Sequence, residues 1–268
     1  MTEISAGLVK QLRDQTGAGM MDCKRALQET NGDLDAAKRL LRERGLASAG
    51  KRSGRATTEG LVGYRIDNGR GTMVAVGCET EPVSKTSEFQ AFAKKVLDTV
   101  EADGPDGVES LDAERTELVA ALGENVVVTG AERYEATNGQ VLEGYVHPPA
   151  NKIGVLVLLE GGSQELARQL AMHVSFASPE WTSRDDVPPE ALEAEREIYL
   201  NSDEVQSKPE AAREKIVAGM LNKRFFAASP GGVLADQAWI HDSSKTVGQA
   251  LEDAGARLVA FRRLSVSG

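Results

Sequence analysis

An internal repeat runs through most of this chain. Its first copy begins with two apolar runs, residues 61–64 and 72–76, on either side of the pair Asn68-Gly69. Asn-Gly between apolar runs is typical of a tight β-hairpin, because both residues tolerate positive φ. The copy continues with a helical pattern at 88–96 and ends with an apolar run at 125–129. We therefore expect a strand pair, a helix and a closing strand.

The second copy has the same order. Its apolar runs, 141–146 and 153–159, are separated by Pro148-Pro149 and followed by a helical pattern at 165–174 and an apolar run at 257–261. Within each copy the strands and helices are grouped and do not alternate strictly, which is typical of α+β folds. The sequence therefore predicts two duplicated subdomains, each a small antiparallel sheet covered by helices.

Three short helical patterns precede the repeat and form a mini-domain at residues 1–45. Gly17 follows the first pattern as a stop signal, Asp33 can cap the third, and we expect Gly45 to end it. Residues 46–60 are rich in Ala, Ser, Gly and Thr and are expected to be a linker.

The repeat gives a core N-subdomain at residues 61–140 and a core C-subdomain at 141–268. Inside the second subdomain, helical patterns near 188–225 predict an inserted helical hairpin. The expected fold class is therefore α+β, with a three-helix domain ahead of a duplicated core.

The charge balance favours a protein partner. The formal net charge is −10, whereas surfaces that bind nucleic acid or anionic membranes usually carry excess Lys and Arg. A short basic run in the linker, Lys51, Arg52 and Arg55, could touch RNA or an acidic partner, or could simply keep the segment solvated. No apolar run approaches the roughly 20 residues of a membrane span. We expect neither nucleic acid nor membrane to be required.

The usual signatures of chemistry are missing. Gly17 and Gly19 lack the third glycine of a dinucleotide fingerprint, and no P-loop lysine follows them. The two cysteines, Cys23 and Cys78, have no zinc-ligand spacing, the histidines have no metal spacing, and no nucleophile elbow is present. We therefore expect no enzyme, no catalytic residue, no metal and no cofactor, and a reducing, cytoplasmic location.

One junction is chemically unusual. The predicted strand at 72–76 leads into Glu79-Thr80-Glu81-Pro82-Val83, with two carboxylates and a proline. Because proline fixes φ and disfavours helix at the residue before it, we expect a stiff, projecting, anionic loop. The loop is either a solvated turn or a probe that enters the site of a partner.

Several motifs together resemble bacterial translation elongation factor Ts. They are Leu8-Val9-Lys10, Leu12-Arg13, the run from Thr16 to Lys24, Ala26-Leu27, Asn31-Gly32-Asp33, Phe89-Gln90-Ala91-Phe92-Ala93, Ile153-Gly154-Val155-Leu156-Val157, Ala171-Met172-His173-Val174 and Lys245-Thr246-Val247-Gly248-Gln249. The resemblance covers essentially the whole chain. It implies a guanine nucleotide exchange factor that binds elongation factor Tu and promotes GDP release during translation elongation. It also implies a ubiquitin-associated-like three-helix domain and a core of two subdomains. The competing hypothesis is an adaptor that uses the three-helix domain for protein binding.

The resemblance also implies which residues meet the GTPase. In the mini-domain they are Arg13, Met20 and Met21, so the glycine corner presents adaptable methionines to a protein; alternatively, the methionines belong to the small core. In the core, Ile153, Gly154 and His173 are implied to grip the flank of the GTPase domain, although His173 could also be a satisfied, half-buried histidine.

The family signature after the strand is Thr-Asp-Phe-Val-Ala-Lys, and its Asp-Phe pair lies near the Mg²⁺ site of the GTPase. This chain has Thr80-Glu81-Pro82-Val83-Ser84-Lys85 instead. The acid is kept with one more methylene, and the aromatic side chain is absent. The resemblance therefore implies contact by Thr80, Glu81, Pro82 and Val83, with more of the work left to the His173 helix and the mini-domain.

Overall fold

The computed structural model describes residues 4–268, without the side chains of residues 46–49 and 51. The side chain of Lys51, part of the basic run, thus lies outside the described residues. The chain forms two compact units. Unit 1 contains the residues up to Glu135 together with Val146–Gly154 and Leu264–Gly268, and unit 2 contains Ala136–Tyr145 and Val155–Arg263. The domain boundaries expected at 45, 60 and 140 stay predictions.

Unit 1 begins with three helices, α1 (Ala6–Thr16), α2 (Met20–Glu29) and α3 (Leu34–Arg52). Gly17 ends α1 in the left-handed conformation, with φ of 67°, and its N–H is bonded to the Arg13 carbonyl. The Asp33 side chain caps α3 by accepting from the N–H groups of Asp35 and Ala36. The first stop signal and the Asp33 cap are confirmed.

Gly45 does not end α3, so this prediction is wrong. The helix continues to Arg52 and takes up part of the expected linker. A Cβ at Gly45 would lie 2.5 Å from the Ala120 carbonyl oxygen and 2.8 Å from the Ala120 Cβ. Ala120 belongs to α6 (Asp112–Leu122). The glycine therefore serves close packing between two helices, at a cost of about 1 kcal/mol in helix propensity.

The first sheet has the antiparallel order β1-β2-β3. Its strands are β1 (Glu59–Asp67), β2 (Arg70–Cys78) and β3 (Val126–Glu135). Asp67 pairs with Arg70 across a two-residue turn, in which Asn68 and Gly69 have φ of 48° and 76°. Positive φ at both positions is the type I′ geometry of tight hairpins. The predicted hairpin and its closing strand are confirmed.

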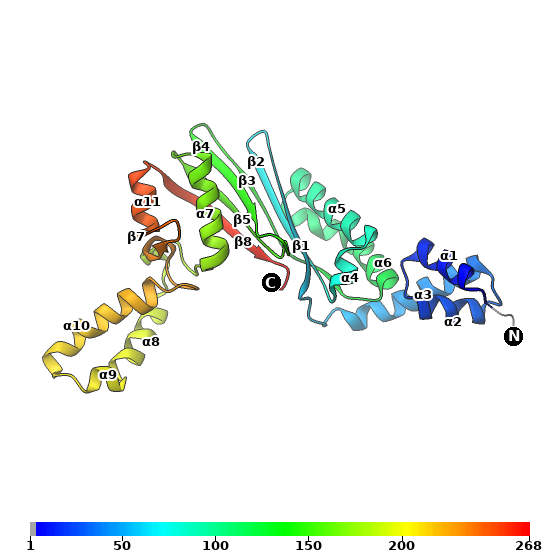
Figure 1. Cartoon of the computed structure of the whole chain (residues 1–268), viewed down its shortest axis with the longest axis horizontal. Helices are drawn as coiled ribbons and strands as arrows, with labels where there is room; N and C mark the ends of the chain where they lie inside the picture. Colours follow the sequence, from blue (N-terminus) through cyan, green and yellow to red (C-terminus); the bar gives the residue numbers. More distant parts are fainter. Residues whose placement is uncertain (1–3) are drawn as a thin grey trace. The chain divides into compact units, whose positions relative to one another are not determined.

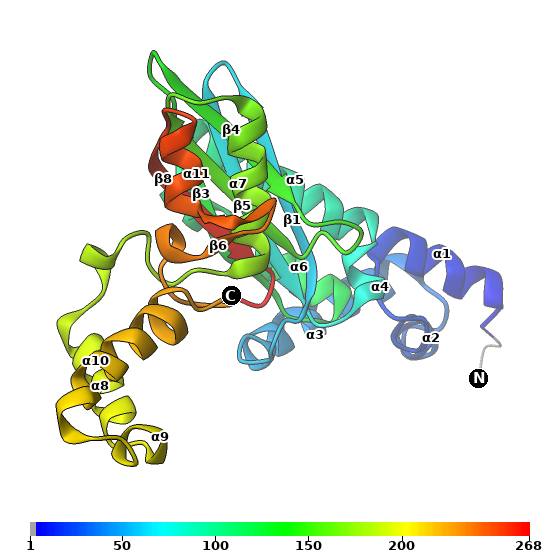
Figure 2. The same cartoon turned by 60° about the vertical axis from the view of Figure 1, so that its left-hand side comes forward.

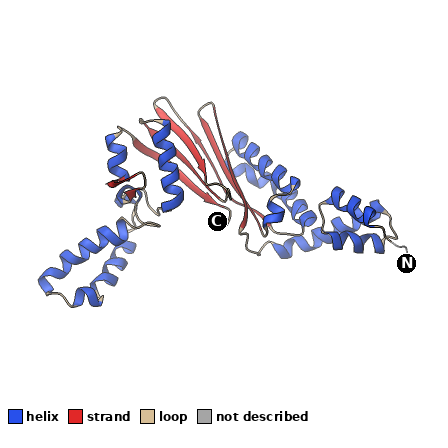
Figure 3. Cartoon of the chain, viewed as in Figure 1, coloured by secondary structure: helices blue, strands red, loops and turns tan. Residues whose placement is uncertain are grey.

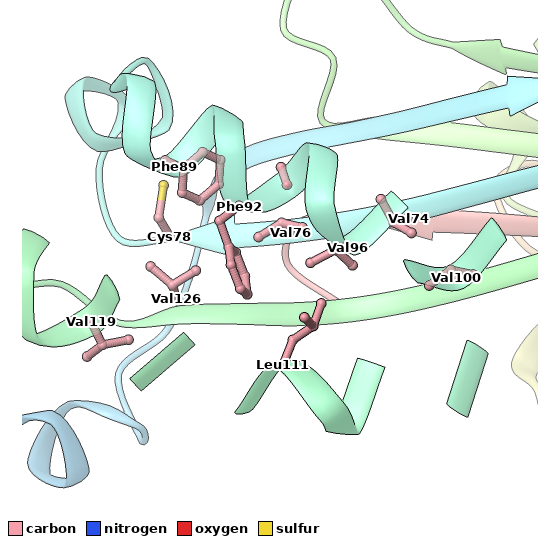
Figure 4. Packing of buried hydrophobic residues seen from close by; sticks show 11 residues of the cluster. Val74, Val76, Cys78, Phe89, Phe92, Val96, Val100, Leu111, Val119 and Val126 are labelled. Carbon is pink, nitrogen blue, oxygen red and sulfur yellow. The ribbon is translucent and has the colours of Figure 1, made fainter. Parts of the chain in front are cut away.

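Helix α5 (Ser87–Asp103) covers this sheet, followed by the 3₁₀ helix η1 (Pro105–Leu111) and by α6. Figure 4 shows side chains of α5, such as Phe89 and Phe92, pointing toward Val76 and Val126 of the strands. This apolar cluster is the core of the first copy.

The second sheet has the order β4-β5-β8, from β4 (Gln140–Val146), β5 (Ile153–Glu160) and β8 (Arg257–Ser265). In both sheets the closing strand therefore lies beside the second strand of the pair. Helix α7 (Gln164–Ala177) and helix α11 (Val247–Asp253) pack on its core (Figure 3). A small hairpin of β6 (Ala238–Trp239) and β7 (Asp242–Thr246) precedes α11.

The helical insertion is also present. It consists of α8 (Pro189–Leu200), α9 (Asp203–Gln206) and α10 (Glu210–Met220), and a π-helical turn, η3 (Leu221–Phe226), follows. Figures 1 and 2 show α8 and α10 side by side within unit 2, with α9 at the end of the pair. Short 3₁₀ turns, η2 (Arg184–Asp186) and η4 (Leu234–Asp236), flank the insertion. The α+β fold class is confirmed. No helix in the described part of the chain is long and apolar enough to cross a membrane.

Candidate functional site

The strand exit folds into one helical turn, α4 (Glu81–Ser84). Thr80 is its N-cap, and Pro82 lies in its first turn. Proline fits there because the first N–H groups of a helix have no partner within the helix. The expected non-helical loop is therefore wrong: Glu81 takes the first helical position despite the proline that follows.

The two carboxylates of the exit have different surroundings. Glu79 turns back into the chain, where its Oε1 accepts from the Asn125 N–H at 2.7 Å and the carboxylate pairs with Arg55. Glu81 is exposed and pairs with Lys85 at 2.6 Å, one helical turn later. The hydrogen bond from Lys85 lowers the pKa of Glu81, so this carboxylate is charged. Of these two carboxylates, only that of Glu81 therefore faces outward.

The other residues of the turn divide in the same way. Pro82 is exposed, whereas Val83 is half-buried and packs against the first core. The backbone N–H and the hydroxyl of Thr80 both donate to the Glu124 carboxylate, at 3.0 and 2.6 Å. The outward face of α4 thus consists of Glu81 and Pro82.

The glycine corner of the three-helix domain exposes both methionines. Met20 and Met21 are 44% and 64% exposed at the start of α2. The alternative in which they form the small core is not realised, and Arg13 in the last turn of α1 is also exposed. A Cβ at Gly17 would lie 3.5 Å from Glu88 Oε1, in the first turn of α5. Within unit 1 the corner therefore neighbours the segment that follows α4.

His173 is buried, with 1% of its surface exposed. Its Nε2 lies 2.9 Å from Gln237 Oε1, and its Nδ1 accepts from the Ile240 N–H at 3.4 Å. These partners fix the tautomer with the proton on Nε2. The ring stacks on Trp239 at 5.3 Å between centroids, and burial lowers the pKa of His173. The expectation that this ring lies on a partner surface is corrected: it is a satisfied core histidine.

Ile153 and Gly154 are also turned inward. Ile153 is half-buried, and its carbonyl accepts from the His147 N–H at 2.9 Å. A Cβ at Gly154 would lie 2.5 Å from Val62 Cγ1 and 3.1 Å from Met73 Sδ. Gly154 is thus a packing glycine at the start of β5 and presents no side chain to a partner.

The described residues contain no group of three or more His, Cys, Asp or Glu side chains that could hold a metal ion. Burial raises the pKa of the Cys78 thiol to about 12, which leaves no thiolate for nucleophilic chemistry at neutral pH.

Comparison with known proteins identifies the family. A family model described as "Elongation factor TS" matches residues 79–268. The elongation factor Ts proteins of Alkalilimnicola ehrlichii and Thioalkalivibrio sulfidiphilus are each 42% identical over 275 residues, covering 98% of this chain and 92% of theirs. That of Escherichia coli K12 is 40% identical over 270 residues, covering 99% of this chain and 92% of its own. The chain belongs to the elongation factor Ts family.

The residues expected to meet a partner fall into two groups. Arg13, Met20, Met21, Glu81 and Pro82 are exposed, whereas the other five are turned at least partly inward or bonded within the chain. That second group is Thr80, Val83, Ile153, Gly154 and His173.

Two exposed apolar side chains of unit 2 were not among the residues predicted from the sequence. Phe176 on α7 is 73% exposed, and Ile240, whose N–H is bonded to His173, is 44% exposed. The signal for Phe176 was present, since it lies outside the apolar stripe of α7 that includes Leu170 and Val174. The position of Ile240 depends on tertiary contacts with α7 and had no local signal.

Proposed function

We propose that this chain loosens GDP in elongation factor Tu with two sets of outward side chains in unit 1: Glu81 and Pro82 of α4, and Arg13, Met20 and Met21 of the three-helix domain. As a member of the elongation factor Ts family it is a guanine nucleotide exchange factor for elongation factor Tu in translation elongation. The observation that carries this function is the similarity to elongation factor Ts proteins over 98% of the chain.

The proposed contact of α4 is the Mg²⁺ region of the GTPase domain. A GTPase holds the phosphates of GDP partly through Mg²⁺, and the exposed, ionised Glu81 brings negative charge to that region. Pro82 adds a rigid apolar surface without an aromatic ring. In unit 2, Phe176 and Ile240 replace the His173 ring as the proposed contact of the α7 region.

The factor needs no nucleotide pocket and performs no chemical step of its own. If it binds the loosened GTPase more tightly than the GDP-bound form, GDP and the factor displace each other by linkage. Neither nucleic acid nor a membrane takes part in this scheme, and we propose that it operates in the cytoplasm.

Stopped-flow release of fluorescent GDP from elongation factor Tu tests the proposal. Adding this protein is expected to accelerate release strongly, since each roughly 1.4 kcal/mol of coupling is worth a factor of ten in affinity. A pull-down with ubiquitin in place of elongation factor Tu tests the adaptor hypothesis. No acceleration of GDP release, together with retention on ubiquitin, would favour the adaptor.

A further inference from the structure

The loop between α6 and β3 holds the start of α4. Glu124 accepts two hydrogen bonds from Thr80: one from its N–H to Oε2 at 3.0 Å, and one from its hydroxyl to Oε1 at 2.6 Å. An N-cap threonine usually turns its hydroxyl to the first-turn N–H groups of its own helix. Thr80 makes no such bond. Its hydroxyl is therefore committed to a different segment of the chain.

The next residue of the same loop holds two further segments. The Asn125 N–H donates to Glu79 Oε1 at 2.7 Å, at the end of β2. The Asn125 side-chain amide donates to the carbonyls of Arg55, at 2.8 Å, and Ser53, at 3.4 Å. Ser53 directly follows α3, and Asn125 is buried with 1% exposure. Two adjacent residues thus bind both the entry to α4 and the exit from α3.

We infer that Glu124 and Asn125 are positioning residues for nucleotide exchange: they fix α4 and the end of α3 on one short loop, so that Glu81 and Pro82 keep a set spacing from Met20 and Met21. The inference rests on the proposed function. It adds two residues that act through α4 and α3 and not by direct contact with the partner. Preorganised contacts spend less binding free energy on ordering, so more remains to loosen the nucleotide.

Two substitutions test the link to α4, Glu124→Ala and Thr80→Val. Thr80→Val removes the hydroxyl donor but no helix cap, because the hydroxyl does not cap α4. At saturating factor, each variant is expected to release GDP from elongation factor Tu at least about fivefold more slowly, the lower end of a typical coupling between sites. Thr80→Val removes one of the two bonds that Glu124→Ala removes, so the double variant is expected to be no slower than Glu124→Ala.

The readout separates positioning from loss of folded protein. A smaller folded fraction would raise the factor concentration needed for half-maximal release and leave the saturating rate unchanged. Glu109→Ala, at an exposed carboxylate of the neighbouring η1, is the matched control and is expected to behave as the wild type. Thermal unfolding of each variant confirms that it is folded.

Asn125→Ala tests the link to α3 in the full chain. We expect faster tryptic cleavage after Arg52 and Arg55, seen by mass spectrometry as fragments that begin at Ser53 or Ala56. An unchanged saturating rate in folded Thr80→Val and Glu124→Ala would overturn the inference. The proposed function itself would fail in a different way, because the wild type would then not accelerate GDP release in the same assay.

Discussion

Gly154 lies at the start of β5, where β1 and β2 leave room for a hydrogen atom only. A Cβ there would approach Val62 Cγ1 to 2.5 Å and Met73 Sδ to 3.1 Å. We expect Gly154→Ala to lower the free energy of unfolding by about 1–3 kcal/mol, the usual cost of overpacking a core. The urea midpoint of the purified variant measures this.

Gly63→Ala in β1 is the matched control. A Cβ there would meet nothing closer than Leu61 Cδ1 at 3.9 Å, and its φ is not positive. It should leave stability unchanged or raise it by up to about 1 kcal/mol through the unfolded chain. An equal loss of unfolding free energy in Gly154→Ala and Gly63→Ala would contradict the packing role of Gly154.

His173 makes stability depend on pH near neutrality. Burial lowers its pKa in the folded state, so between the folded and unfolded values the unfolded chain binds more protons. Stability is therefore full above the unfolded pKa of about 6.5 and falls as pH drops toward the folded pKa, by no more than about 1.4 kcal/mol per pH unit. Urea unfolding at pH 7.5 and pH 5.5 is the measurement.

The comparison of two variants isolates this effect. His147→Gln, at an exposed histidine, should keep the loss of stability between pH 7.5 and 5.5. His173→Gln should be less stable at pH 7.5 but should lose less on acidification. The same pH response in both variants would mean that His173 does not titrate in the unfolding transition.

At the scale of elements, the proposed effect on the Mg²⁺ region of the GTPase comes from one helical turn, α4. We expect Glu81→Ala to slow GDP release from elongation factor Tu about tenfold or less, while complex formation stays measurable, because the outward carboxylate is lost and the backbone is kept. Lys85→Ala removes the ion pair but keeps the carboxylate, and its release rate should stay close to that of the wild type. If both variants slow release equally, the ion pair matters and the free carboxylate does not.

Helix α7 carries an exposed aromatic side chain, Phe176. A minority of interface side chains, in which large aromatic residues are enriched, cost more than about 1 kcal/mol of binding when they are truncated. Phe176→Ala should therefore weaken the complex with elongation factor Tu by at least about fivefold in titration calorimetry, with little change in the free protein. Gln164→Ala, exposed at the other end of the helix, is the control. Unchanged affinity for Phe176→Ala would remove this face from the interface.

The sequence predicted those elements whose signals are local. Asn68-Gly69 specifies its hairpin through the φ preferences of two residues. The helical spacing of apolar residues in α5 and α7 predicts helices without knowledge of what they pack against. The prediction that Gly45 ends α3 was wrong because this glycine packs against Ala120 of α6, a contact that no local pattern encodes. The prediction that His173 lies on a partner surface was wrong for the same reason, since its hydrogen-bond partner Gln237 lies 64 residues later in the sequence.

At the scale of the molecule, both units carry outward side chains that the proposal assigns to the same partner. Unit 1 has the methionine corner and α4, and unit 2 has Phe176 and Ile240. When one set binds, the second binds from a high effective concentration, so the summed affinity can exceed that of either set.

GDP and this protein are linked ligands of elongation factor Tu in the proposed scheme. Calorimetric titration of this protein into nucleotide-free and GDP-bound elongation factor Tu should give affinities that differ by at least about a hundredfold, the upper range of typical couplings. The affinity of elongation factor Tu for GDP should fall by the same ratio when the factor is bound, because the thermodynamic cycle closes. Equal affinity for the two forms would leave the factor without any differential free energy, and faster GDP release would then have to come from the rates alone.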